Sequence, residues 1–305
     1  MTSIRVGTAS WTDPTLVKEA NFYPKKSMTA EQRLRFYASI FTAVEVDATY
    51  YFPPTPDTVG LWTRRTPADF RMDVKAYSLF TQHPTNARSL WADVAEALPD
   101  EHRRKRSVYL EHLPAPAVDL AWEKFRDALL PLFSAGKLGG VFFQFPPWFG
   151  PRRDNRDYLQ QVAQRLPDYP VAVEFRNRAW MGEDDDRRRT LGLLESAGLA
   201  YVCVDGPQGF PSSIPPVLAA TSDLAVVRFH GHNAETWNAK GITPAERFRY
   251  LYGQDELAGW APRVRELAEQ AHETHAIFNN CYRDYGTTNA RQLGALLEEG
   301  LQPDA

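Results

Sequence analysis

Short apolar runs alternate with longer amphipathic stretches along the whole 305-residue chain. Brief runs rich in Val, Ile, Phe and Tyr predict β-strands, and apolar positions that recur every three to four residues predict helices. The expected strands are residues 4–9, 43–50, 70–77, 140–145, 171–176, 201–205, 224–230 and 275–280. The expected helices are residues 30–40, 57–65, 120–133, 157–165, 188–197, 257–271 and 289–298.

This alternation of strands and helices predicts an α/β fold, a TIM-like (β/α)8 barrel that forms a single domain over residues 1–305. Repeated β–α units give parallel strands with right-handed crossovers, and eight of them favour closure. A doubly wound open sheet is the alternative. The long connections 78–119, 206–223 and 231–254 all follow strands, and 206–223 reads as an irregular loop. We therefore expect these loops at the C-terminal face, where barrels carry their sites.

The strand VAVEFR, residues 171–176, contains two charges where a buried strand is usually apolar. Side chains alternate along a strand, so Glu174 and Arg176 share one face while Val171, Val173 and Phe175 share the other. The apolar face should pack under the helices. The two charged side chains are therefore predicted to point into the barrel.

Polar residues recur in the same way toward the C-terminal ends of the other predicted strands. They are Glu45 and Asp47, Asp73 and Lys75, Gln144, Asp205, Arg228 and His230, and Asn279 and Asn280. Buried charge is costly unless it is paired or serves a function. The set therefore predicts a functional site, and the alternative is a structural ion-pair network, such as Glu174 with Arg176 or Lys75, that plugs the barrel.

Several segments also carry a family resemblance. They are VGTASW at 6–11, NFYP at 21–24, and residues 41–62, 139–149, 171–180, 226–237 and 277–293. This ordered set resembles the YecE-like family, a bacterial and archaeal family of unknown function, over essentially the whole chain. The resemblance implies a barrel and supplies no established reaction. Family members commonly have Gly where this chain has Ala9, and Asn where it has Asp47, so a role for Asp47 need not extend to the family.

The basic residues among the strand ends predict the kind of ligand. Lys75, Arg176 and Arg228 bring fixed positive charge to one mouth, and arginine suits bidentate recognition of phosphate or carboxylate. An anion is therefore expected, with Gln144, Asn279 and Asn280 as further polar contacts. Thr287 or Thr288 is expected to cap the last helix, where free backbone N–H groups could also hold an anion.

Aromatic residues gather in the predicted loops. Trp11, Tyr50, Trp180 and Trp237 are candidates to stack on a sugar or base of the ligand, and Tyr51, Phe52 and Trp148 lie in the same loops. We expect some of these rings only to pack the loops. Trp62, Trp122 and Trp260 fall in helical patterns and are expected in the core.

His230 is the leading acid–base candidate, because its ordinary pKa lies near neutrality. Glu174 and Glu45 are the next acid–base candidates. The carboxylates with His230 could hold a divalent metal, but their spacing does not require one, and the nearby cations could neutralise them instead. The sequence therefore does not decide whether a cofactor is bound. It contains no GxGxxG, P-loop or GxSxG motif that would indicate a nucleotide cofactor or an acyl-transfer nucleophile.

Composition and the N-terminal sequence limit the binding partners and the cellular location that we expect. A net charge of -3 does not indicate nucleic acid or an acidic membrane, although local basic patches remain open. The N-terminal residues lack the pattern of a signal peptide, and we expect a cytoplasmic protein. Cys203 and Cys281 do not form a CxxC motif and are expected to be small packing residues.

These features together lead to the functional hypothesis. We expect an enzyme that acts on an anionic, phosphorylated, ring-bearing substrate, most concretely by hydrolysing a phosphoester or phosphodiester. The alternative is a non-catalytic binder of a phosphorylated metabolite or of single-stranded nucleic acid. A purely structural polar plug is the third interpretation.

Overall fold

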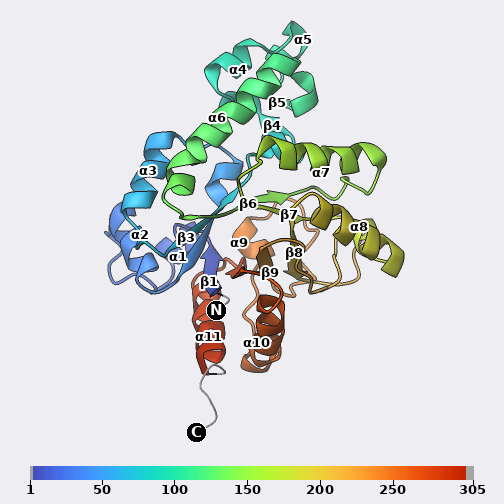
Figure 1. The fold of residues 1–305 in the computed structure, drawn as a ribbon. Helices are drawn as coiled ribbons and strands as arrows, with labels where there is room; N and C mark the ends of the chain where they lie inside the picture. Colours follow the sequence, from blue (N-terminus) through green and yellow to red (C-terminus); the bar gives the residue numbers. More distant parts are fainter. Residues whose placement is uncertain (1–2, 300–305) are drawn as a thin grey trace.

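In a computed structural model that describes residues 3–299, eight parallel strands close into a barrel surrounded by helices (Figure 1). The strands are β1 (Ser3–Ala9), β2 (Ala43–Val46), β3 (Arg71–Lys75), β6 (Leu138–Gln144), β7 (Val171–Glu174), β8 (Ala200–Asp205), β9 (Leu224–Phe229) and β10 (Glu273–Phe278). Their order around the barrel is β1-β10-β9-β8-β7-β6-β3-β2. The predicted TIM-like barrel is confirmed.

Helices join most successive strands and cover the outside of the barrel (Figure 1). They are α1 (Pro14–Lys18), α2 (Ala30–Ala38), α3 (Pro56–Arg64), α6 (Ala115–Ser134), α7 (Arg153–Arg165), α8 (Asp184–Ser196), α9 (Pro244–Arg247), α10 (Gln254–Ala268) and α11 (Tyr285–Glu299). The seven predicted helices all appear with shifted ends. The segment after β8 contains no helix, as its proline and glycine content predicted.

The long connection after β3 forms a small lobe of its own. It contains a hairpin of β4 (Thr85–Asn86) and β5 (Ser107–Val108), helices α4 (Ala92–Glu96) and α5 (Asp100–Arg103), and the 3-10 turns η2 (Ser78–Thr81), η3 (Ala87–Ser89) and η4 (Leu110–His112). Figure 1 shows α4 and α5 beside the N-terminal part of α6, away from the barrel.

Several predicted strand boundaries were wrong as well, and the end of β2 and the start of the last helix changed most in meaning. The strand expected over 43–50 ends at Val46, and Asp47–Tyr50 form the 3-10 turn η1. The hydroxyl of Thr49 donates to the carbonyls of Val46 and Lys75, at 2.8 and 2.6 Å, and this ties the turn to β3. Helix α11 begins at Tyr285, so Thr287 and Thr288 lie inside its first turn and do not cap it.

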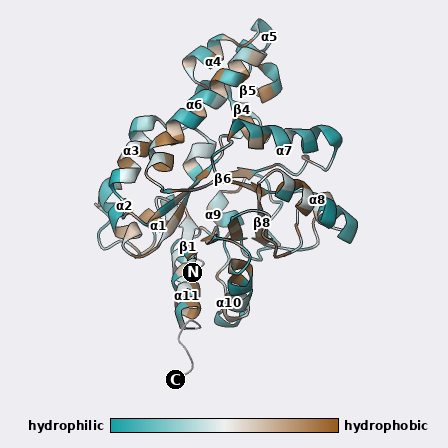
Figure 2. Cartoon of the chain, in the orientation of Figure 1, coloured by the Kyte–Doolittle hydropathy of each residue, from teal (hydrophilic) through white to brown (hydrophobic). Residues whose placement is uncertain are grey.

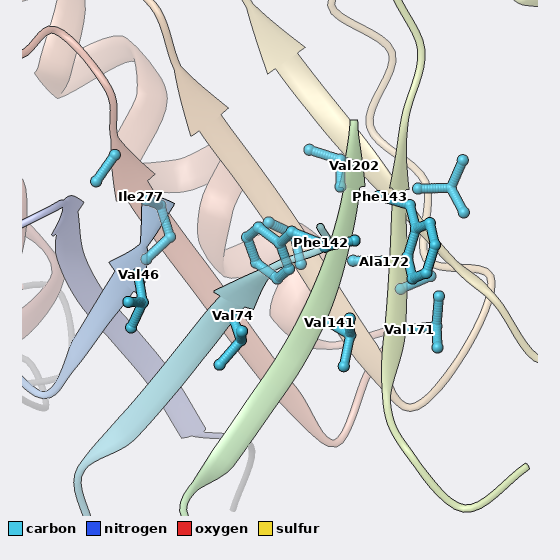
Figure 3. Close-up of a cluster of buried hydrophobic side chains, with 14 of the residues drawn as sticks. Val46, Val74, Val141, Phe142, Phe143, Val171, Ala172, Val202 and Ile277 are labelled. Carbon is cyan, nitrogen blue, oxygen red and sulfur yellow. The ribbon is translucent and has the colours of Figure 1, made fainter. Parts of the chain in front are cut away.

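Apolar side chains fill the space between the strands and the helices. On β6, Phe143 faces outward, and its ring centroid lies 6.1 Å from that of Trp122 on α6. Phe142 lies on the opposite side of the strand from Phe143 (Figure 3). The outer faces of the surrounding helices are largely hydrophilic, most clearly on α7 and α8 (Figure 2). The helices therefore have the one-sided apolar pattern expected from the sequence.

A separate ion cluster closes the N-terminal end of the barrel. His275 Nδ1 lies 2.8 Å from Asp73 Oδ1, and both side chains are fully buried. Below them, Arg5 Nε donates to Glu273 at 2.7 Å. The close approach requires a glycine on β6, because a Cβ at Gly139 would lie 2.4 Å from Asp73 Oδ1. Asp73 therefore belongs to this end of the barrel and not to the mouth.

Candidate functional site

A buried ion cluster occupies the barrel where β2, β7 and β9 end. Arg228 donates from Nε and Nη2 to both carboxylate oxygens of Glu45, at 2.9 and 2.8 Å. Its Nη1 donates to Glu174. All three side chains are at most 2% exposed. These contacts fit the structural interpretation, because each charge of the three has an opposite charge in contact.

Arg176 and His230 form a second layer against the same carboxylate. Arg176 Nε donates to Glu174 Oε1 at 2.5 Å, and its Nη2 lies 3.0 Å from Nε2 of His230. His230 Nε2 also lies 3.2 Å from Glu174 Oε1, and Nδ1 lies 2.9 Å from Nδ2 of Asn279. Since a guanidinium only donates, Nε2 either accepts from Arg176 or, when it carries the ring proton, donates to Glu174, and it cannot do both.

The protonation states follow from burial and from these partners. Burial lowers the pKa of His230 to about 3, and Arg176 acts in the same direction, so the ring is neutral at physiological pH. Burial alone would raise the pKa of Glu174, but Arg176 and Arg228 outweigh it and hold that pKa well below its usual range. Glu174 therefore remains ionised.

Beyond the strand ends lies a cavity of about 420 Å³, which we call the mouth cavity. Its polar lining residues are Asp47, Lys75, Gln144, Arg176, Ser212, Asn238, Arg247 and Asn279, and its aromatic lining residues are Tyr51, Trp237 and Phe248. A volume of this size is typical of small-molecule sites. A second hollow of about 630 Å³ lies outside the barrel along α10 and α11 and contains none of the predicted site residues.

Two charged side chains on the wall of the mouth cavity lack a direct counter-ion. Within residues 3–299, no carboxylate lies within 4.0 Å of the Lys75 ammonium, and no basic nitrogen lies that close to the Asp47 carboxylate. The nearest polar partner of Lys75 Nζ is Gln144 Oε1 at 3.3 Å. Burial lowers the pKa of Lys75 and raises that of Asp47. Both groups are therefore available to a ligand.

One wall of the mouth cavity comes from the loop between β9 and α10. Arg247 donates to the carbonyls of Trp237 and Ala239, which fixes the loop, and the guanidinium of Arg176 lies 4.9 Å from the Trp237 ring centre. Sequence reasoning missed Arg247. The available signal was the capping box of α9, in which Thr243 and Glu246 bond to each other's backbone N–H.

The structure brings five of the predicted contact residues together on the mouth cavity. They are Lys75, Gln144, Arg176, Trp237 and Asn279. The cluster residues Glu45, Glu174, Arg228 and His230 lie beneath it and are covered by protein. Tyr50 lies at the edge, with its ring centre 5.1 Å from Lys75 Nζ. The predicted acid–base residues therefore do not reach the cavity wall, whereas Asp47 does.

Three other predicted contact residues have packing positions instead. Trp180 is fully buried in the 3-10 turn η5 (Arg178–Trp180), where its Nε1 donates to the Phe149 carbonyl at 2.6 Å. Trp11 packs edge-on against Trp62, with ring centres 6.0 Å apart. Asn280 donates to Asn289 Oδ1 at 2.8 Å. None of the three lines the mouth cavity.

The metal ligands considered from the sequence are bonded to other protein groups. Asp205 accepts from Tyr252 at 2.7 Å and lies 3.0 Å from Nε2 of His232, while Glu45 and Glu174 hold Arg228. Over the described part of the chain, no group of three or more His, Cys, Asp or Glu side chains has an arrangement that could hold a metal ion. Among the same residues, no helix is both long enough and apolar enough to span a membrane.

Comparisons with known proteins identify relatives. Residues 5–304 match the model of the family described as "Protein of unknown function DUF72". The UPF0759 protein YunF of Bacillus subtilis (strain 168) is 30% identical over 307 residues, covering 98% of each chain.

Solved structures agree. A DUF72 family protein from Enterococcus faecalis V583 has a TM-score of 0.77 at 27% identity, over 99% of this chain and 97% of its own. One from Thermotoga maritima MSB8 has a TM-score of 0.74 at 30% identity, over 97% and 99%. The resemblance noted from the motifs is to this same family, and the chain belongs to the DUF72 family of proteins of unknown function.

Proposed function

We propose that the mouth cavity binds a small phosphorylated compound that carries a ring, and that the protein is an enzyme that hydrolyses a phosphoester in it. The observation that carries this proposal is the pair of unpaired charges, Lys75 and Asp47, on one cavity wall. A purely structural plug would leave neither charge without a counter-ion. Arg176 adds a second cation on the same wall, and Trp237 and Phe248 offer ring faces.

In this proposal each residue has a distinct task. Lys75 and Arg176 hold the phosphoryl oxygens and stabilise the charge that develops on them. A water molecule attacks the phosphorus, its proton passes to Asp47, and the bond from phosphorus to the leaving oxygen breaks. Asp47 then returns the proton to that oxygen. Burial raises the pKa of Asp47 toward the range in which a carboxyl both accepts and donates protons, which suits this role.

The buried cluster beneath supports this site without touching the substrate. Glu174 fixes the Nε edge of Arg176, and Glu174 is itself held by Arg228. The guanidinium is therefore preorganised at the cavity floor, so little ordering remains to be done when an anion binds. In this assignment His230 is a positioning residue for Arg176 and Glu174.

A non-catalytic binder of a phosphorylated metabolite or of single-stranded nucleic acid is the second candidate. It is favoured by the burial of Glu45, Glu174 and His230, which leaves Asp47 as the acid–base group on the mouth cavity. A cytoplasmic location, where phosphorylated metabolites are made, forms part of either proposal.

The test measures binding and turnover separately. Wild type, Lys75→Met and Asp47→Asn are titrated with p-nitrophenyl phosphate and with a panel of sugar phosphates and nucleotides by calorimetry, and phosphate release is measured on the same panel. We expect Lys75→Met to weaken binding, and Asp47→Asn to bind normally but to release no phosphate. Binding without turnover by wild type would favour the binder, and no binding of any of these compounds would overturn both proposals.

A further inference from the structure

A second cavity adjoins the mouth cavity at Tyr51. It has a volume of about 350 Å³, and its walls include Tyr50, Tyr51, Phe52, Asn86 and Arg106. We call it the rim cavity. Tyr51 lines both cavities, so the two cavities share a wall at this side chain.

Exposed aromatic rings are concentrated in and around the rim cavity. Tyr51, Phe52 and Trp148 are 56%, 63% and 54% exposed. Among the described residues, the next most exposed Phe, Tyr or Trp side chain is Phe133, at 37%. Scattered exposed rings need no explanation, but two of these, Tyr51 and Phe52, line the same cavity and so indicate a recognition surface. The charge needed for the reaction lies next to this surface, on Lys75.

A continuous series of rings connects the cation to the rim. The Tyr50 ring centre lies 5.1 Å from Lys75 Nζ and 5.0 Å from the Tyr51 ring centre. On its other side, His83 lies 5.3 Å from Tyr50 and 5.8 Å from Trp148. Burial lowers the pKa of His83 to about 4, so at neutral pH it is an uncharged ring like its neighbours. The rim cavity therefore offers aromatic faces that are separated only by Tyr50 from Lys75, where the phosphate is proposed to bind.

We propose that the rim cavity is a second ring subsite, so that the substrate is a phosphodiester with a ring on each side of the phosphate. This inference rests on the proposed function and narrows its substrate class from phosphoesters to diesters. One ring lies against Trp237 and Phe248 in the mouth cavity, the phosphate lies at Lys75 and Arg176, and the second ring stacks on Tyr51 and Phe52. A monoester would leave the rim cavity unused.

Two diesters of equal charge isolate the second ring. Bis(p-nitrophenyl) phosphate and methyl p-nitrophenyl phosphate are both singly charged and differ in whether the second substituent is a ring. Their dissociation constants are measured by calorimetry for wild type, Phe52→Ala, Tyr51→Ala, Lys75→Met and Phe133→Ala. Phe133 is the matched control, because it lies at the C-terminal end of α6, which leads into the N-terminal end of β6 at the opposite face of the barrel.

We expect wild type to bind the two-ring diester about tenfold more tightly than the methyl diester. Phe52→Ala and Tyr51→Ala should remove most of that difference, Lys75→Met should weaken both diesters, and Phe133→Ala should change neither. If both diesters bind wild type equally, or if Phe52→Ala leaves the difference intact, the rim subsite is overturned while the anion site stands. If neither diester binds, the anion site itself is refuted together with the rim.

Discussion

Removing the guanidinium of Arg228 should destabilise the fold strongly. Its three nitrogens bond to Glu45 and Glu174, and all three residues are essentially excluded from water. In Arg228→Met the stem of the side chain is kept, but buried Glu45 loses its only ion pair within residues 3–299 and Glu174 keeps only the one with Arg176. Breaking a buried pair in this way costs about 3–5 kcal/mol, a large part of the roughly 5–15 kcal/mol by which a domain is stable.

Urea unfolding at pH 7, followed by circular dichroism, measures this loss as a change in midpoint at constant slope. The reasoning also predicts a rescue. The double variant Arg228→Met, Glu45→Gln removes the carboxylate whose only ion pair in the described part of the chain was with Arg228 and keeps the pair of Glu174 with Arg176, so it should recover about half or more of the lost free energy. A loss below about 1 kcal/mol in the single variant, or a double variant no more stable than the single one, would refute this explanation by uncompensated charge.

Three further predictions concern the two ends of the barrel. Lys75→Met should leave the free energy of unfolding unchanged or higher, because it removes a charge that has no direct counter-ion. The same variant should bind phosphate esters about tenfold or more weakly, as measured by calorimetry. Burial alone would lower the pKa of His275, but Asp73 raises it to about 9, above the unfolded value, so the stability it contributes is complete below about pH 6.5 and disappears as pH rises through about 9. Urea titrations at pH 6.5 and 10 should therefore differ by up to about 3 kcal/mol, and Asp73→Asn should flatten that difference. Gly139→Ala should lower the melting temperature, since its Cβ would lie 2.4 Å from Asp73 Oδ1 and 2.6 Å from His275 Cε1; an unchanged melting temperature would contradict the close packing.

Side-chain alternation was enough to place the charges of the mouth, because it depends only on strand geometry. Glu174 and Arg228 both follow the inward parity of their strands, and the structure joins them. The same rule could not distinguish Asp73 from Glu45, which share an inward direction. They lie in separate ion clusters at different depths of the barrel, and depth depends on the stagger of neighbouring strands, which a strand's own pattern does not contain.

Where the chain leaves a strand, parity no longer applies. Asn177 accepts a hydrogen bond from the backbone N–H of Ala179, and the resulting turn η5 carries Trp180 back under the outer layer, where its ring stacks 4.4 Å from Phe175. Val46 is followed directly by η1, which moves Asp47 onto the cavity wall. These turns form through short-range side-chain and backbone bonds that compete with strand pairing, so the aromatic and acidic loop residues were the least predictable part of the site.

The functional and the structural interpretations of the polar mouth apply to different layers of it. Arg228, Glu45 and Glu174 satisfy one another and would be expected in a protein with no ligand at all. Lys75 and Asp47, one layer outward, would not, because neither has a direct ion pair among the described residues and the cost of burial outweighs their attraction for each other. A chain selected only for stability would readily lose such charges, since apolar side chains of similar size would pack equally well. Their presence beside a cavity is therefore better explained by a bound anion than by the barrel beneath it.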